Sequence, residues 1–300
     1  MNKVYISSQR SQKNAAMSFS FGQKSNTGVM SAGESSYYDD MTANLWRTKI
    51  ALFGLLLVSG AVQLVLVAAT NTFDLRASTA SVLRTSAAAD LSGFPALEVT
   101  DLSPINVGYV YAASCLFAGM ALVLSLFFHS EEADDYNEGG QSSVFWLVQL
   151  AGTTPLVLSV AMTAGMSTWS ELLTMCVVWA NVLFAYLLGW RSRAINGKSM
   201  SYLYVALAAI SFVVVNVLMY ISFGFMTGST SPLALPGLYV LPLVVFTVFS
   251  FVMLLLPLLS RTAMFGDSAL MWMYVVGALL VILTSWLAFI VFAADGITYP

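Results

Sequence analysis

The chain has 300 residues, of which 58% are hydrophobic and only 9% are charged. A soluble domain carries about 25% charged residues, so this composition excludes an ordinary soluble protein and predicts an integral, multi-pass membrane protein in a lipid bilayer. The net charge of -3, with no basic patch, argues against a nucleic-acid binder.

The first 45 residues are polar and rich in Ser, Asn and Gln, and Glu34 is their first acidic residue. Such a segment cannot bury enough apolar surface to offset the entropy lost on ordering. We therefore expect residues 1–45 to form a flexible polar tail that binds a soluble partner. The tail lacks the apolar core of a secretory signal; its Ser-rich, acid-poor composition resembles a transit peptide, although it contains little Arg.

Seven apolar segments follow the tail, each long enough to cross a bilayer as a helix. The predicted spans are 47–69, 107–128, 144–166, 171–190, 201–226, 235–259 and 270–293. None alternates in the manner of a strand, and a helix satisfies its own backbone polar groups inside the membrane. We expect an all-α membrane domain of seven helices over residues 46–296.

The Lys and Arg residues predict the orientation of these helices. With the N-terminus inside, only Arg76 and Arg84 of the 12 basic residues fall in outer segments. The positive-inside rule therefore predicts a cytoplasmic N-terminus and an external C-terminus.

The longest connection, residues 70–106, is then external. It contains TASVLRT and ALEVTDL, whose strand character predicts a small hairpin. Further along, Thr168-Trp169-Ser170-Glu171 has the pattern of a capping box at the start of the fourth helix. The alternative role for Glu171 is a proton carrier at the membrane edge.

Charged and reactive side chains are scarce in the apolar segments. Helices two to seven contain no ionisable interior residue of the Asp, Glu, Lys, Arg or His type, while Arg47 and Lys49 lie near the inner end of the first, where we expect them to reach the headgroups. His129 lies among acidic residues that could form a metal site with it, but a solvated helix end explains it better. Cys115 and Cys176 are expected to act as small hydrophobic residues. The pattern argues against a pump, an enzyme and a cofactor-binding site.

The neutral polar residues of the spans have two readings, interhelical hydrogen bonding or a polar-lined pocket. They are Gln63, Gln149, Thr153, Thr154, Asn181, Asn216, Thr247, Thr284 and Ser285. Gln149 and Thr153 are the best pocket candidates because, four residues apart, they share one helix face.

Three helices resemble those of the heliorhodopsin family. The first, LWRTKIALFGLLLVSGAVQLVLVAATNTFDL, is similar in its leading basic residues, its mid-helix Gly and its closing Asn and Phe. The third, FWLVQLAGTTPLVLSVAMTAG, and the last, ILTSWLAFIVFAADG, follow the family pattern in order and spacing. The resemblance covers most of residues 45–295. It implies a seven-transmembrane-helix rhodopsin-like bundle with its N-terminus inside, and an external loop that forms a small sheet at a dimer contact.

The chain departs from this family at the residues that carry its photochemistry. The lysine that binds retinal is matched by Thr284, and there is no Lys at all after Lys198. The glutamate counterion is matched by Gln149, which agrees physically, because a neutral site needs no counterion. Histidines of the family's first two helices are matched near Leu57 and Leu122. The sequence therefore excludes covalent retinal chemistry.

Two functions remain in view. The first is a non-photoactive heliorhodopsin-like protein, a structural or partner-binding component that forms a homodimer or joins a membrane complex. The alternative is a binder of, or passive conduit for, a small apolar ligand or lipid in the vacated retinal pocket. The candidate pocket residues are Gln149, Thr153, Asn216, Thr284, Trp286 and Phe289. A G-protein-coupled receptor would need the opposite orientation.

Overall fold

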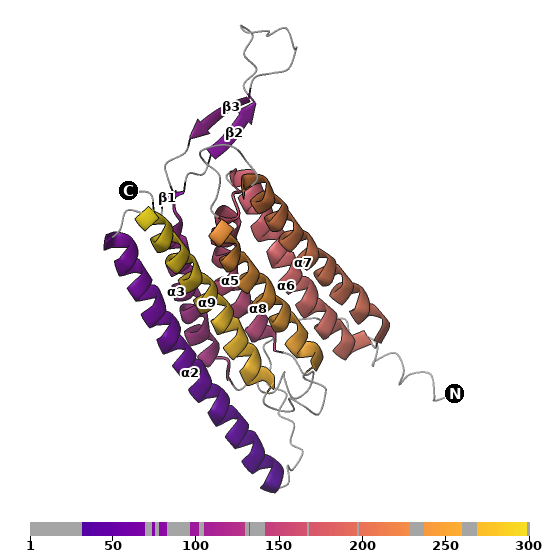
Figure 1. Cartoon of the computed structure of the whole chain (residues 1–300). Helices are drawn as coiled ribbons and strands as arrows, with labels where there is room; N and C mark the ends of the chain where they lie inside the picture. Colours follow the sequence, from indigo (N-terminus) through magenta and orange to yellow (C-terminus); the bar gives the residue numbers. More distant parts are fainter. Residues whose placement is uncertain are drawn as a thin grey trace. The chain divides into compact units, whose positions relative to one another are not determined.

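The computed structural model describes residues 32–69, 74–75, 78–82, 97–101, 105–129, 132, 142–166, 168–196, 198–227, 237–259 and 269–298 (Figure 1). The chain divides into two units, Met1–Tyr38 and Asp39–Pro300. Within the first unit only residues 32–38 are described, as the first turns of a helix. All packing and sites below belong to the second unit.

The second unit contains six long apolar helices and the membrane span of a seventh, α2, which begins in the first unit. They are α2 (Ala32–Ala69), α3 (Val107–Leu126), α5 (Ser143–Thr163), α6 (Trp169–Asn196), α7 (Lys198–Thr227), α8 (Val240–Leu259) and α9 (Ala269–Thr298). A short 3-10 turn, η1 (Gly237–Tyr239), leads into α8. Among the described residues, each of these seven helices is long and apolar enough to cross a membrane. The prediction of an all-α, seven-helix membrane bundle is confirmed, and the chain is an integral multi-pass membrane protein.

The first helix begins earlier than its apolar run. The expected flexible tail extended to residue 45, but α2 is helical from Ala32, so the last part of that segment is ordered as helix. This part contains no proline, and extending an existing helix is far easier than nucleating one. The rest of the expected tail, residues 1–31, lies outside the described residues.

Helices α5 and α9 are the best buried. Each has 61% of its membrane span buried, whereas α2 has only 28%. Helix α3 packs against α5 and α9, α6 against α5 and α7, and α8 against α9 (Figure 1). At Gly152 of α5 the backbones approach so closely that a Cβ would lie 2.6 Å from the Cβ of Ala118 on α3. A side chain larger than hydrogen at this position would push the two helices apart.

The outer surface of the bundle is apolar. On α7, the side chains of Leu203, Ile210 and Phe225 are all more than 60% exposed. A soluble monomer does not expose contiguous apolar patches of the size that such faces form. The exposed faces fit a lipid environment, in agreement with the predicted membrane location.

The connection between α2 and α3 contains two short antiparallel strand pairs. Strand β1 (Asp74–Leu75) pairs with β4 (Ile105–Asn106), and β2 (Ser78–Val82) pairs with β3 (Leu97–Asp101). The predicted hairpin is therefore present, with Val82 opposite Leu97. Strand β4 runs directly into α3, whose first turn is capped by the Asn106 side chain, which accepts from the Gly108 amide at 3.0 Å.

The predicted capping box at the start of α6 is also present. The Thr168 hydroxyl accepts from the Glu171 amide at 3.4 Å, and the Glu171 carboxylate accepts from the Thr168 amide at 3.4 Å. This reciprocal pair satisfies two amides that the helix itself cannot. It gives Glu171 a structural role at an exposed position.

Candidate functional site: a buried ion pair beside a filled pocket

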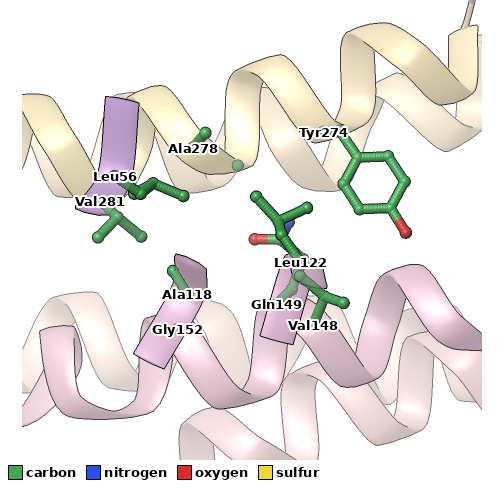
Figure 2. A pocket seen from close by; sticks show the side chains of 10 residues that line it. Leu56, Ala118, Leu122, Val148, Gln149, Gly152, Tyr274, Ala278 and Val281 are labelled. Atoms are coloured by element: carbon green, nitrogen blue, oxygen red, sulfur yellow. The ribbon is translucent and has the colours of Figure 1, made fainter. Parts of the chain in front are cut away.

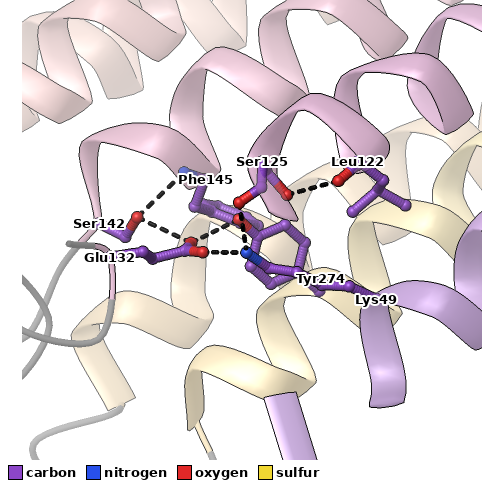
Figure 3. Close-up of polar contacts among 7 residues, drawn as sticks. All are labelled: Lys49, Leu122, Ser125, Glu132, Ser142, Phe145 and Tyr274. Carbon is purple, nitrogen blue, oxygen red and sulfur yellow. Dashed lines mark hydrogen bonds and ion pairs between the residues drawn. The ribbon is translucent and has the colours of Figure 1, made fainter. Parts of the chain in front are cut away.

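Lys49 of α2 forms an ion pair with Glu132, which lies between α3 and α5 (Figure 3). Both side chains are fully buried. This corrects the expectation that Lys49 reaches the headgroups. Its neighbour Arg47 is exposed, as expected of a residue at a membrane edge. Desolvating two charges is costly, so a pair of this kind needs further hydrogen bonds to be stable.

Glu132 receives those further hydrogen bonds from two hydroxyl groups. The Ser142 hydroxyl donates to one carboxylate oxygen at 2.8 Å, and the Tyr274 hydroxyl of α9 donates to the same oxygen. Ser142 is also the N-cap of α5, since its oxygen accepts from the Phe145 amide at 3.1 Å. The carboxylate thus joins α2, α9 and the start of α5 at one point (Figure 3).

Aromatic rings surround the ion pair. The Lys49 ammonium lies 4.9 Å from the centre of the Tyr274 ring, within the range of a cation–π contact. Phe145 meets the Tyr274 ring edge to face, with centroids 5.1 Å apart. The Lys49 ammonium also donates a long hydrogen bond of 3.4 Å to the Ser125 carbonyl near the end of α3. The cluster therefore combines charge, hydrogen bonds and apolar cover.

His129 lies one helical turn before Glu132 and is half-buried. The Glu132 amide donates to the Phe128 carbonyl at 2.9 Å, which ties Glu132 to the end of α3. The ring of His129 hydrogen-bonds to the backbone of Thr42 on α2, while its Nδ1 atom is buried with no hydrogen-bond partner among the described residues. Burial and the nearby Lys49 charge lower the pKa of His129, and the Glu132 carboxylate offsets this only in part. The expected solvated helix end is therefore a partly buried residue beside the ion pair.

The sequence contained one signal that pointed to this cluster. A lysine several residues inside an apolar run needs an anion, because an unpaired charge there is costly. Glu132 could not be selected as that anion, since it is one of four acidic residues in HSEEADDYNEGGQ before Asn137. The contribution of Tyr274 carried no sequence signal, because a tyrosine in an apolar helix is common.

Gln149 of α5, one of the predicted pocket residues, is buried against α9 (Figure 2). A Cβ added at Gly277 of α9 would overlap the Gln149 amide group, so the missing side chain makes room for the glutamine. The two residues therefore close the interior between α5 and α9.

What remains between α3, α5 and α9 is a cavity of about 10 Å³ (Figure 2). Its lining residues are Leu56, Ala118, Leu122, Val148, Gln149, Gly152, Tyr274, Gly277, Ala278 and Val281. A volume of this size is close to the minimum that holds one water molecule. The Tyr274 ring lines this cavity and its hydroxyl bonds to Glu132, so the cavity and the ion pair are neighbours.

The six predicted pocket residues lie in different surroundings. Of these residues, Gln149 alone lines the cavity described above. Thr284 is fully buried, and its hydroxyl has no hydrogen-bond partner among the described residues. The indole of Trp286 donates to Ser59 of α2 at 3.3 Å, and its ring packs against Phe289 with centroids 6.2 Å apart.

The other two predicted pocket residues bond between helices. The Thr153 hydroxyl of α5 accepts from the Trp179 indole of α6 at 2.8 Å. The Asn216 side chain of α7 accepts from the Thr247 hydroxyl of α8 at 2.7 Å. These contacts match the interhelical reading of the polar residues.

Gln63 takes part in a second buried polar group. Its amide donates to the Ser285 hydroxyl of α9 at 2.9 Å, and the Cys115 thiol of α3 lies 3.4 Å from the same hydroxyl. Both cysteines are free thiols. This group joins the poorly buried α2 to α3 and α9 in the middle of the membrane span.

The cluster supplies charge and hydrogen bonds. Across the described part of the chain, no three His, Cys, Asp or Glu side chains gather closely enough to hold a metal ion. Chemically, the arrangement places one titratable imidazole beside a buried ion pair that holds α2 to the rest of the bundle.

Comparison with known proteins assigns no family. No protein-family model matches the sequence, and no curated protein matches it. The conclusion that the chain forms a seven-helix membrane bundle therefore rests on the length and the apolar composition of its helices.

Proposed function

We propose that the chain is a non-photoactive, heliorhodopsin-like membrane protein that acts as a structural or partner-binding component. In this proposal it is not an enzyme, it binds no covalent retinal, and its N-terminus faces the cytoplasm. The filled interior between α3, α5 and α9 is the observation that carries the proposal.

A ligand of ordinary size needs a cavity of about 300–1,000 Å³. The cavity beside Gln149 offers about 10 Å³. Gln149 and Gly277 close it by direct contact, so enlarging it would require a change of backbone or side-chain packing. This favours the structural function over the alternative, a binder or conduit for an apolar ligand.

Absorption spectroscopy tests the chromophore part of the proposal. The purified protein is incubated with all-trans-retinal, washed, and treated with borohydride, next to a pigment-forming microbial rhodopsin as a positive control. We expect no visible band and no retinal adduct by mass spectrometry. A band with a stable adduct would overturn the proposal.

The partner that the resemblance favours is a second copy of the chain, held through the connection between α2 and α3. Strands β2 and β3 form a two-stranded sheet in the described chain. An isolated two-stranded ribbon is marginally stable, and its outer edges can pair with another strand. Pairing between the strands of two copies would stabilise the ribbon and cover its outer edges.

Mass measurement in a mild detergent tests this partner. We expect a protein mass of twice 32.3 kDa for the wild type. Thr100→Pro removes a backbone donor from β3 and is expected to yield single copies, while Ser8→Pro in the tail serves as the matched control. A wild type of one copy, or a Thr100→Pro variant that stays paired, would contradict the assignment.

A further inference from the structure

Helix α2 depends on polar contacts more than the other spans do. Only 28% of its membrane span is buried. Near its Thr42 end, the fully buried contacts of Lys49 with Glu132 and with the Ser125 carbonyl hold it to the bundle. His129 adds a hydrogen bond to the Thr42 backbone. The position of this end of α2 is therefore set by a few charged and polar groups.

The surroundings of His129 favour the neutral form of its ring. Its ring bonds to the backbone of Thr42, and its Nδ1 atom is buried with no hydrogen-bond partner among the described residues. A proton added there would have no acceptor among the described residues and would place a second cation beside Lys49. In the described part of the chain, the anion that interacts with both groups is Glu132, which already accepts hydrogen bonds from Tyr274 and Ser142. A protonated His129 would therefore compete with Lys49 for a carboxylate that already accepts hydrogen bonds from two hydroxyl groups.

We propose that Lys49, Glu132 and His129 form a proton-operated latch, which holds the start of the membrane span of α2, at Thr42, against the bundle near neutral pH and releases it when His129 takes up a proton.

The direction of the pH response follows from proton linkage. Burial and the Lys49 charge lower the pKa of His129 in the closed latch, whereas in the open state the ring is solvated and its pKa returns toward the ordinary value of about 6.5. The open state therefore binds more protons, and acidification favours it. The latch is closed above the ordinary histidine pKa and weakens as the pH falls through it. Between pH 7.5 and pH 5.5 the closed state can lose up to about tenfold in relative population.

Carboxylate footprinting measures this opening. The full-length protein in detergent is treated with carbodiimide and glycine ethyl ester, and modification of Glu132 is read by mass spectrometry with fragmentation that separates it from Glu131. Glu171, which is exposed in the closed structure, serves as the reference in the same chain and corrects for the pH dependence of the reagent. The measured quantity is the ratio of Glu132 to Glu171 labelling.

We expect this ratio to rise by up to about tenfold between pH 7.5 and pH 5.5 in the wild type. His129→Gln, which stays neutral, should abolish the rise, and His129→Lys, a cation at both pH values, should show a high ratio already at pH 7.5. A wild-type ratio that does not change with pH would overturn the latch. An equal rise in His129→Gln would show that another group senses the proton, and it would overturn the assignment to His129.

Discussion

Removing one ion from the pair between Lys49 and Glu132 is predicted to destabilise the bundle strongly. Both side chains are fully buried, so either single substitution leaves an ion without its partner. Breaking a buried pair in this way costs about 3–5 kcal/mol, whereas replacing both ions with neutral groups is often neutral or stabilising. We expect Lys49→Met and Glu132→Gln each to lower the free energy of unfolding, and the double variant to recover most of the loss.

The two single substitutions should differ in size. Without Lys49, the carboxylate of Glu132 still accepts hydrogen bonds from Tyr274 and Ser142, so Lys49→Met should cost about 3 kcal/mol, the lower end of the range. Without the carboxylate, Lys49 retains only the 3.4 Å contact with the Ser125 carbonyl, so Glu132→Gln should cost about 5 kcal/mol.

Equilibrium unfolding in mixed micelles, with a rising fraction of denaturing detergent and helical circular dichroism as the signal, measures these losses. Arg47→Met is the matched control, since Arg47 lies two residues away on the same helix but is exposed; we expect a change within about 0.5 kcal/mol. Single losses under about 1 kcal/mol would place the pair among weak surface pairs. A double variant that loses the sum of the two single losses would show that the ions act independently.

Three further substitutions test the neighbouring contacts by the same unfolding measurement. Gly277→Ala should lower the free energy of unfolding by about 1–3 kcal/mol, because the added Cβ overlaps the Gln149 amide. Adding Gln149→Ala to the same chain should recover most of that loss. A loss that persists would show that the strain does not come from Gln149. Tyr274→Phe keeps the ring but removes the hydroxyl that donates to Glu132, so we expect a loss of about 1.5–3 kcal/mol, and no loss would mean that this bond is not formed. Gln63→Leu removes a hydrogen bond between membrane helices and should cost only about 0.6–1.7 kcal/mol; a larger loss would reveal a role beyond helix pairing.

The seven spans could be predicted because the bilayer imposes one requirement on all of them. Each needs a long apolar run, and such a run is visible without any knowledge of its neighbours. The start of α2 at Ala32 was missed for the complementary reason. A helix that continues into a polar segment is favoured by the helix already formed, and the composition of that segment does not show it.

The ion pair was not predicted, because a sequence shows how deep a charge lies in an apolar run but not which residue is its partner. Lys49 sits near the end of an apolar run, where a side chain can reach the headgroups equally well. Its burial depends on Glu132, which the turn after α3 brings beneath it. In the same way, Gln149 could be matched to a counterion position, but its contact with Gly277 arises from the packing of two helices that are distant in sequence.

The location of the charges explains how the interior can be so closely packed. The buried side chains of Thr284 and Gln149 are neutral, and the buried ion pair lies at the end of the bundle, between α2 and the turn after α3. Tyr274 links the two regions, because its ring lines the small cavity and its hydroxyl bonds to Glu132. A bundle that keeps its buried charges at one end can fill its centre with neutral side chains. The element that can then change position is α2, the helix that those charges hold.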